Sequence, residues 1–273
     1  MAEPSLDEVY QLASLLQEAW ESPSSAMMGF QKRGERPNPG RFALVFGLAA
    51  HTHEVAVSAL LLWRQGHQLA AMPLIRAAWE SAISAQWVAQ AADGAQALLA
   101  ESARQHVAAA VTYIKAGVRE IAEAGARMIA EDYAEEQLTS SRPQGRNFQR
   151  LCEDFNGGPV LYAYYRYMSA YIHPRATVVD QYLSPSATGD GIAALRTEPR
   201  FDDEQREFSS PALPFFAPWS MILAARAVDF IDKSHHRRSQ LRKLSKDLGV
   251  DSELHLTAEA ERRIRAEIRN RRR

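Results

Sequence analysis

The sequence predicts an all-α protein, built as an antiparallel helical bundle with additional C-terminal helices. Apolar residues recur every three or four positions over several long segments, which is the spacing of one helix face. Clusters of Gly, Pro and polar residues separate these segments, and no alternation of strands with helices is visible. A chain of 273 residues with 46% hydrophobic content is long enough to fold around one large core or two smaller ones.

The N-terminal part, residues 1–40, is expected to hold one helix followed by a linker. Between Leu6 and Trp20 the apolar residues fall on one face of an amphipathic helix. Residues 22–40 are rich in Gly and Pro, which is typical of a loop.

Residues 41–183 are predicted to form the bundle core. Four long helices are expected at 41–66, 69–92, 95–124 and 160–173, with shorter helices at 126–138 and 147–155. The first of these is apolar on most sides, which indicates a position at the centre of the bundle. Gly66 ends it, and Pro73 is tolerated in the first turn of the helix that returns.

The C-terminal third divides into a long loop and a helical tail. Residues 184–214 are rich in Ser, Pro, Gly and charge, so we expect a loop or lid with at most a short helical turn near 192–195. Residues 215–273 are expected to contain a buried helix at 215–231 and a basic tail whose final part, 258–272, forms a surface helix.

Cysteine usage and hydropathy predict a cytoplasmic protein that spans no membrane. Cys152 is the one cysteine, and the first residues have neither the basic start nor the apolar core of a signal peptide. The longest apolar run, residues 42–63, is interrupted by His51, His53 and Glu54, which are costly in lipid.

The basic tail suggests a polyanionic partner. Residues 233–273 hold 13 basic and 6 acidic residues, whereas the rest of the chain holds 19 basic and 27 acidic residues. Such an arm can contact RNA or an acidic protein surface. The candidate contacts are Arg262, Arg263, Arg265 and Arg269. The alternatives are a solvated charged helix and a tail that docks onto the acidic body.

A polar stripe on the predicted helix 160–173 is the candidate site. At about 100° per residue, four polar side chains fall on one face. They are Tyr162, Arg166, Ser169 and His173. Arg166 and His173 would then lie roughly 10 Å apart along the axis. Pro174 disfavours helical geometry at the residue before it, so the helix should end near His173.

A charged pair on the helix 69–92 is expected to support this stripe or to serve the fold alone. Arg76 and Glu80 are four residues apart and share an apolar face. Either they form a structural salt bridge, or Glu80 orients Arg166 or His173 from across the bundle.

The spacing Arg166-x6-His173 resembles the R-x4–6-H motif of the HEPN superfamily, whose all-helical members include metal-independent RNases of toxins and antiphage defence. The resemblance implies that His173 is a general acid or base and that Arg166 binds phosphate. It also implies a homodimer with a shared site and, for a toxin, an antitoxin-like protein partner. Ser169 departs from the Asn or Asp that is frequent in these nucleases.

Two segments, 74–80 and 169–174, also resemble a bacterial all-helical domain family of unknown function. Together the two resemblances cover about residues 40 to 180. Beside them, Tyr162 or Tyr165 could stack on an RNA base.

No phosphate-binding loop, dinucleotide fingerprint, zinc-protease motif or nucleophile elbow is present, so no cofactor is expected. His51 and Glu54 are three residues apart, but no matching pair on another predicted helix completes a metal site.

Three functions remain open. The first is an HEPN-like RNase or RNA-binding protein. The second is a non-catalytic binding or adaptor module, in which Arg166, His173 and Glu80 form a structural polar network. The third is small-molecule chemistry in an apolar pocket lined by Trp63, Trp79 and Trp87.

Overall fold

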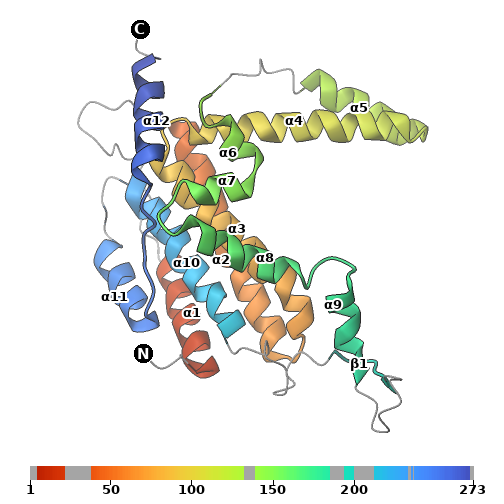
Figure 1. Cartoon of the computed structure of the whole chain (residues 1–273), viewed down its shortest axis with the longest axis vertical. Helices are drawn as coiled ribbons and strands as arrows, with labels where there is room; N and C mark the ends of the chain where they lie inside the picture. The colour runs from red at the N-terminus through yellow and green to blue at the C-terminus, as the bar shows by residue number, and fades with distance from the viewer. Residues whose placement is uncertain are drawn as a thin grey trace. The chain divides into compact units, whose positions relative to one another are not determined.

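The structure, a computed structural model, describes residues 5–21, 38–131, 139–184, 194–199, 212–232, 235 and 237–270. Its described residues form α-helices, one short 3-10 helix and two strands of two residues each (Figure 1). The predicted all-α class is therefore confirmed. The chain divides into two compact units, Met1–Ala89 with Pro159–Leu254 and Gln90–Gly158 with His255–Arg273.

The first unit contains the long apolar helices together with shorter and more polar ones. They are α1 (Leu6–Glu21), α2 (Pro39–Arg64), α3 (Gln68–Gln90), α8 (Gly158–Ser169), α9 (Ala176–Val179), α10 (Ala212–Ile231) and α11 (Arg238–Leu248). A 3-10 turn, Asp180–Tyr182, leads into β1 (Leu183–Ser184), which pairs antiparallel with β2 (Ala194–Leu195).

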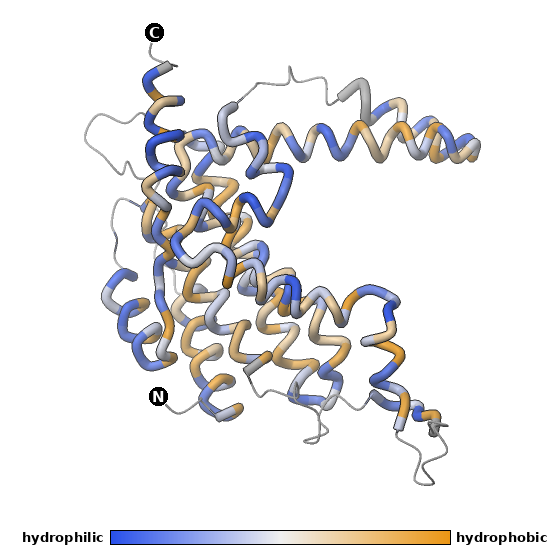
Figure 2. Tube along the Cα trace, viewed as in Figure 1, coloured by the Kyte–Doolittle hydropathy of each residue, from blue (hydrophilic) through white to orange (hydrophobic). Residues whose placement is uncertain are grey.

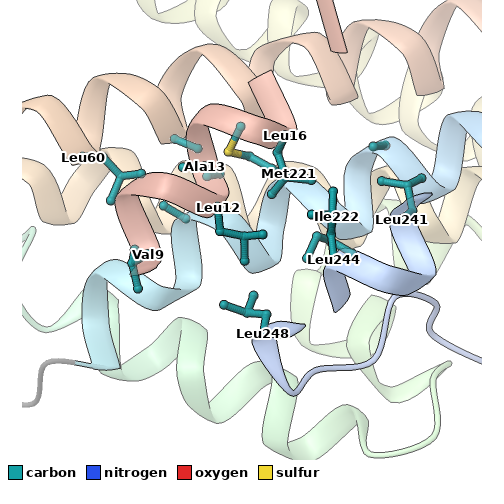
Figure 3. Close-up of a cluster of buried hydrophobic side chains, with 14 of the residues drawn as sticks. Val9, Leu12, Ala13, Leu16, Leu60, Met221, Ile222, Leu241, Leu244 and Leu248 are labelled. Carbon is teal, nitrogen blue, oxygen red and sulfur yellow. The ribbon is translucent and has the colours of Figure 1, made fainter. Parts of the chain in front are cut away.

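One hydrophobic cluster joins α1, α2, α3, α10 and α11 (Figure 3). Its members follow helical spacing on each segment, as in Val9, Leu12, Ala13 and Leu16 of α1 and Leu241, Leu244 and Leu248 of α11. Burying each leucine contributes about 1.5–3 kcal/mol. The core of this unit is therefore built by α1, α10 and α11 together with α2 and α3, whereas the predicted bundle helix 95–124 falls in the second unit.

Two caps fix the ends of α2 and α3. The side chain of Asn38 accepts a hydrogen bond of 2.9 Å from the backbone N–H of Arg41, which satisfies one of the free donors at the start of α2. The guanidinium of Arg41 donates to the carbonyl oxygens of Val88, at 2.9 Å, and Ala89. The start of α2 is thus bonded to the end of α3.

Two described segments, Pro39–Arg64 and Leu213–Ile231, are long and apolar enough to cross a membrane by length and composition alone. Within its most apolar window, the second is 83% buried inside the protein, as expected of a core helix, and the first is 39% buried. Figure 2 shows hydrophobic residues along most of α10. A core helix passes the same test, so the prediction of no membrane span stays a prediction.

The second unit contains α4 (Gly94–Lys115), α5 (Arg119–Glu131), α6 (Arg142–Arg146), α7 (Phe148–Glu153) and α12 (Ala258–Asn270). The prediction of one helix over 95–124 is wrong, because the chain turns between α4 and α5. Gly117 there has a φ of 71°, a left-handed conformation that ends a helix. Gly125 then lets α5 approach α4, since a Cβ would lie 2.7 Å from the carbonyl oxygen of Ala110.

The C-terminal helix α12 docks onto the loop after α7. The backbone N–H of Thr257 donates to the carbonyl of Asp154 at 2.8 Å, and that of Asn156 donates to the carbonyl of His255 at 2.9 Å. Ala260 and Ile264 are buried. Of the alternatives considered for the tail, α12 follows the one in which the tail docks onto the body of the chain.

Several predicted boundaries differ from the structure. The helix predicted at 126–138 is the second half of α5, which ends at Glu131, and 132–138 lie outside the described residues. Of the predicted linker 22–40, residues 22–37 lie outside the described residues, and Pro39 and Gly40 form the start of α2. Most of the segment 184–214 also lies outside them. Of the helical turn expected near 192–195, only Ala194 and Leu195 are described, and they form the strand β2. The prediction of a helical turn is wrong for these two residues. Helix α11 was not predicted.

Candidate functional site

Helix α8 is anchored at its start by glycine and tryptophan. A Cβ on Gly158 would lie 2.1 Å from the carbonyl oxygen of Cys152, so only glycine fits this close approach. The indole N–H of Trp79 on α3 donates to the carbonyl of Leu161 at 3.1 Å. The first turn of α8 is therefore bonded to α3.

The regular part of α8 ends at Ser169, and not near His173 as predicted. The next three residues make bonds of the i to i−3 kind, from Ala170 to Tyr167 and on to Ile172. The hydroxyl of Ser169 donates to the carbonyl of Tyr165 at 2.7 Å, which competes with the helical pattern there. Arg166 therefore lies on the helix, whereas His173 lies on the bend that follows it.

Arg166 and His173 are both exposed. Within the part of the chain that the structure describes, neither side chain has a hydrogen bond, ion pair or ring contact. Both groups are therefore available to a ligand.

The charged pair on α3 reaches α8 through a tyrosine. The guanidinium of Arg76 lies 3.1 Å from the carboxylate of Glu80 and donates to the hydroxyl of Tyr165. The same guanidinium lies over the ring of Tyr165, 4.5 Å from its centroid. The ring of Tyr162 stacks on Tyr165, with centroids 5.7 Å apart. We call Arg76, Glu80 and Tyr165 the α3–α8 network.

Among the described residues, Glu80 forms no hydrogen bond or ion pair with Arg166 or His173. Burial raises the pKa of the Glu80 carboxyl, and the Arg76 charge partly offsets this rise. The side chains of Arg76 and Glu80 are 23% and 38% exposed, so the pair is only partly removed from water. This geometry favours the interpretation that Arg76 and Glu80 form a structural salt bridge, which contacts α8 through Tyr165.

The three tryptophans considered for a ligand pocket are core residues. Trp79 and Trp87 are fully buried and Trp63 nearly so. The ring of Trp79 packs edge-on against Phe216 and Trp219, at centroid distances of 5.2 and 4.8 Å. Their surroundings favour packing over ligand binding.

The histidines and glutamate considered for a metal site do not share one environment. His51 and Glu54 are exposed, whereas His53 is buried against the ring of Trp20, with centroids 4.5 Å apart. Among the described residues, no group of three His, Cys, Asp or Glu side chains is placed to hold a metal ion. The absence of a metal stays a prediction.

The four predicted tail contacts differ in their environments. Arg263 donates two bonds to the buried carboxylate of Asp154, at 3.0 and 2.5 Å, and is thus committed to the fold. Arg265 pairs with Glu261 at 2.6 Å. Arg262 and Arg269 are exposed.

A buried charged network at the end of α10 was not predicted from the sequence. The fully buried Arg226 pairs with Asp229, and its other nitrogen lies 2.6 Å from the carboxylate of Glu253. Arg238 lies 3.7 Å from Asp229. The spacing of Arg226 and Asp229 on an apolar helix was the available signal.

Residues 42–192 match a family of unknown function (DUF5677), and this match covers more than half of the 273 residues. The chain belongs to this family. The predicted likeness to a helical family of unknown function is thereby confirmed. The family range includes the α3–α8 network, Arg166 and His173, whereas α10, α11 and α12 follow it. No curated protein and no solved structure matches the chain.

Proposed function

We propose that this member of the family is an HEPN-like, metal-independent RNase or RNA-binding protein of the toxin or defence type. The observation that supports it is the exposure of Arg166 and His173, two uncommitted side chains near the end of α8. Beside them, the α3–α8 network holds α8 on α3. Helix α8 presents the free guanidinium of Arg166, and the bend that follows it presents the free imidazole of His173. These are two groups that phosphodiester cleavage can use without a metal.

In this proposal Arg166 binds the scissile phosphate. A guanidinium offers planar paired donors to phosphate oxygens and stays charged, so it stabilises the charge that develops on the phosphate without a metal. Tyr162 is the stacking candidate for a base, because Tyr165 is already engaged by Arg76.

His173 carries the proton transfer. A neutral imidazole can accept the proton of the ribose 2′-hydroxyl while the 2′-oxygen attacks phosphorus. The bond from phosphorus to the 5′-oxygen then breaks, and this oxygen needs a proton. In the proposed homodimer the partner subunit's His173 donates it, so one chain supplies the base and the other the acid.

The proposed activity belongs in the cytoplasm, where RNA is present, and a toxin of this type would be held in check by an antitoxin-like protein. Such a partner would act by covering the α8 end. The cytoplasmic location and the antitoxin-like partner are proposed together with the nuclease activity.

Incubation of the purified protein with single-stranded RNA, with and without EDTA, tests the activity. We expect cleavage that EDTA leaves unchanged and that is lost in His173→Ala and in Arg166→Ala. The products should carry 2′,3′-cyclic phosphates and 5′-hydroxyls. Cleavage that EDTA abolishes, or that both variants retain, would contradict the proposal.

A non-catalytic binding module is the second candidate. The observation that favours it is that Arg76 donates hydrogen bonds to both Glu80 and Tyr165, while α8 ends before His173. Polar groups that satisfy each other serve the fold. In this case the purified protein would bind RNA or a protein partner and leave RNA intact, and His173→Ala would change neither result.

A further inference from the structure

Helix α11 carries a concentrated positive charge on a fixed scaffold. Residues 237–248 contain five basic residues and one acidic residue. Three leucines of this helix, Leu241, Leu244 and Leu248, are buried in the core of the first unit. Gly249 ends the helix in a left-handed conformation with a φ of 72°. The helix is thus held by its apolar face, and its orientation does not depend on a ligand.

Three of the cations on α11 form one exposed stripe. Arg242, Lys243 and Lys246 are exposed, and at about 100° per residue they fall within an arc of roughly 100°. In the described part of the chain, none of the three has an ion pair or a hydrogen bond from its side chain. We call these three residues the α11 basic stripe.

The other cations of the basic tail are engaged to different degrees. Arg237 lies over the ring of Trp20, and Arg238 faces the buried Asp229. On α12, Arg263 and Arg265 are paired with carboxylates. Figure 2 shows both α11 and α12 as largely hydrophilic, so hydropathy does not separate them. Arg262 and Arg269 of α12 also lack an ion pair among the described residues, but they are seven residues apart, whereas the three cations of the stripe lie within five residues of one helix. The stripe is therefore the denser group of uncompensated charges.

We infer that the α11 basic stripe binds the phosphate backbone of single-stranded RNA. This inference rests on the proposed function and extends it, since it assigns RNA binding to residues that follow the family range and are separate from the α8 end. Contacts to phosphate need only cations or N–H donors and carry no sequence requirement. From Arg242 to Lys246 the stripe extends about 6 Å along the helix axis, enough for about two phosphates of one strand.

The buried face of α11 argues for RNA over a membrane. Amphipathic helices bind membranes by inserting their apolar face, and the leucines of α11 are already buried in the hydrophobic cluster of the first unit. The exposed side chains of the stripe can therefore bind a partner only through their charge. Counterion release from nucleic acid is driven by charge alone, so RNA is the partner that this surface fits.

The test is a triple substitution, Arg242→Gln/Lys243→Gln/Lys246→Gln, measured by fluorescence anisotropy with a labelled single-stranded RNA at several KCl concentrations. The measurements use a His173→Ala background, so that the RNA stays intact. Each cation lost should reduce the slope of log K against log[KCl] by about 0.7, so the triple variant should lose about 2 from the slope. The melting temperature should not change, since all three side chains are exposed.

The matched control removes the same charge elsewhere. Lys115, Arg119 and Arg127 are exposed residues of the α4–α5 hairpin in the second unit. Their triple substitution to Gln should leave the salt slope within about 0.5 of the starting value, because cations that contact no phosphate release no counterions. Equal losses in both triple variants would show a non-specific effect of net charge and would overturn the inference.

The remaining outcomes separate this inference from the nuclease proposal. RNA binding that depends on the stripe, together with wild-type protein that cleaves no RNA, would support the inference and contradict the nuclease. An unchanged slope in the stripe variant would overturn the inference even if cleavage is observed. Stripe-dependent binding to phosphatidylserine vesicles without binding to RNA would overturn the choice of partner.

Discussion

His53 is held neutral inside the first unit. Its side chain is buried, its Nδ1 lies 3.3 Å from the amide oxygen of Gln17, and its Nε2 has no partner among the described residues. Burial, and then the charge of Arg237, lower the pKa of His53 from 6.5 to about 3. The folded protein therefore binds fewer protons than the unfolded chain when the pH lies between these two values.

This difference predicts a loss of stability in mild acid. The contribution of neutral His53 is fully present above its unfolded pKa of 6.5 and is lost as the pH falls toward about 3. The free energy of unfolding should decrease by about 1.4 kcal/mol per pH unit in that window from this group alone. Urea unfolding at pH 7 and pH 4.5 measures it, and His53→Gln should reduce the decrease by about 2–3 kcal/mol.

His51 provides the control for this measurement. It lies on the same helix but is exposed, so His51→Gln should keep the wild-type pH dependence. If His53→Gln unfolds with the same pH dependence as the wild type, the buried neutral state of His53 would be contradicted. His53→Phe, which keeps a ring against Trp20, serves if the glutamine variant is too unstable to measure.

Arg76 and Arg166 should respond differently to truncation, although both are arginines on neighbouring helices. Arg76→Ala removes the bond to Tyr165, the contact to its ring and the partner of Glu80, so we expect a loss of about 1–3 kcal/mol. Arg166→Ala should stay within about 0.5 kcal/mol of the wild type, because the side chain is exposed and makes no contact among the described residues. Thermal unfolding of the two variants compares them directly, and a larger loss in Arg166→Ala would contradict this geometry.

Distance along the sequence decides which side-chain contacts can be predicted. The pairing of Arg76 with Glu80 follows from a spacing of four residues on one helix, so it was predicted. The contact of Arg76 with Tyr165 joins residues 89 positions apart, and no local pattern encodes it. The burial of His53 was equally hidden, because it depends on α1 packing against α2.

Among the helices, starts and core faces were easier to predict than ends. Apolar spacing placed most of α2, α3, α8 and α10, because a core face repeats along the helix. Pro174 predicts a helix end near His173, four residues later than the observed end, because the chain leaves the helix at Ser169. Helix α11 was missed because its charge masked the spacing of its three leucines.

The docking of α12 should depend on one ion pair. Asp154 is buried, and Arg263 supplies both of its charged bonds from α12. Removing Arg263 takes away these two charged hydrogen bonds, and each hydrogen bond to a charged group contributes about 1.5–3 kcal/mol. In Arg263→Ala, hydrogen exchange should therefore become faster along α12 and around Asp154.

The neighbouring Arg262 is the matched control for α12. It is exposed, so Arg262→Ala should change exchange in α12 only slightly. Equal acceleration in both variants would mean that α12 is loosely held whatever Asp154 contacts. Faster exchange in Arg263→Ala alone supports the docking described above.

For the whole molecule, the fold class was predictable and the division into two units was not. Helical periodicity is local and survives in any arrangement of the helices, so the all-α class follows from it. The second unit combines residues 90–158 with the C-terminal segment from 255, and such a union depends on long-range contacts like the bridge between Phe155 and Leu256. The candidate site was predicted as residues, but the exposure of Arg166 and His173 required the structure.

The proposed shared site predicts a homodimer. In this proposal the acid and the base are two copies of His173, so a monomer would hold only one of them. Sedimentation velocity at micromolar concentration should give a dimer, and activity per chain should fall when dilution separates the copies. A monomer that cleaves RNA at full rate would contradict the shared site.

If Arg166 and His173 act together on RNA, a double-mutant cycle of RNA cleavage will show it. The wild type, Arg166→Ala, His173→Ala and the double variant are compared by kcat/KM and by melting temperature. Residues that act as one catalytic unit are strongly non-additive, so the double variant should be about as inactive as either single variant, and all four proteins should melt alike. Additive losses, or lower melting temperatures with no wild-type cleavage to lose, would contradict the claim.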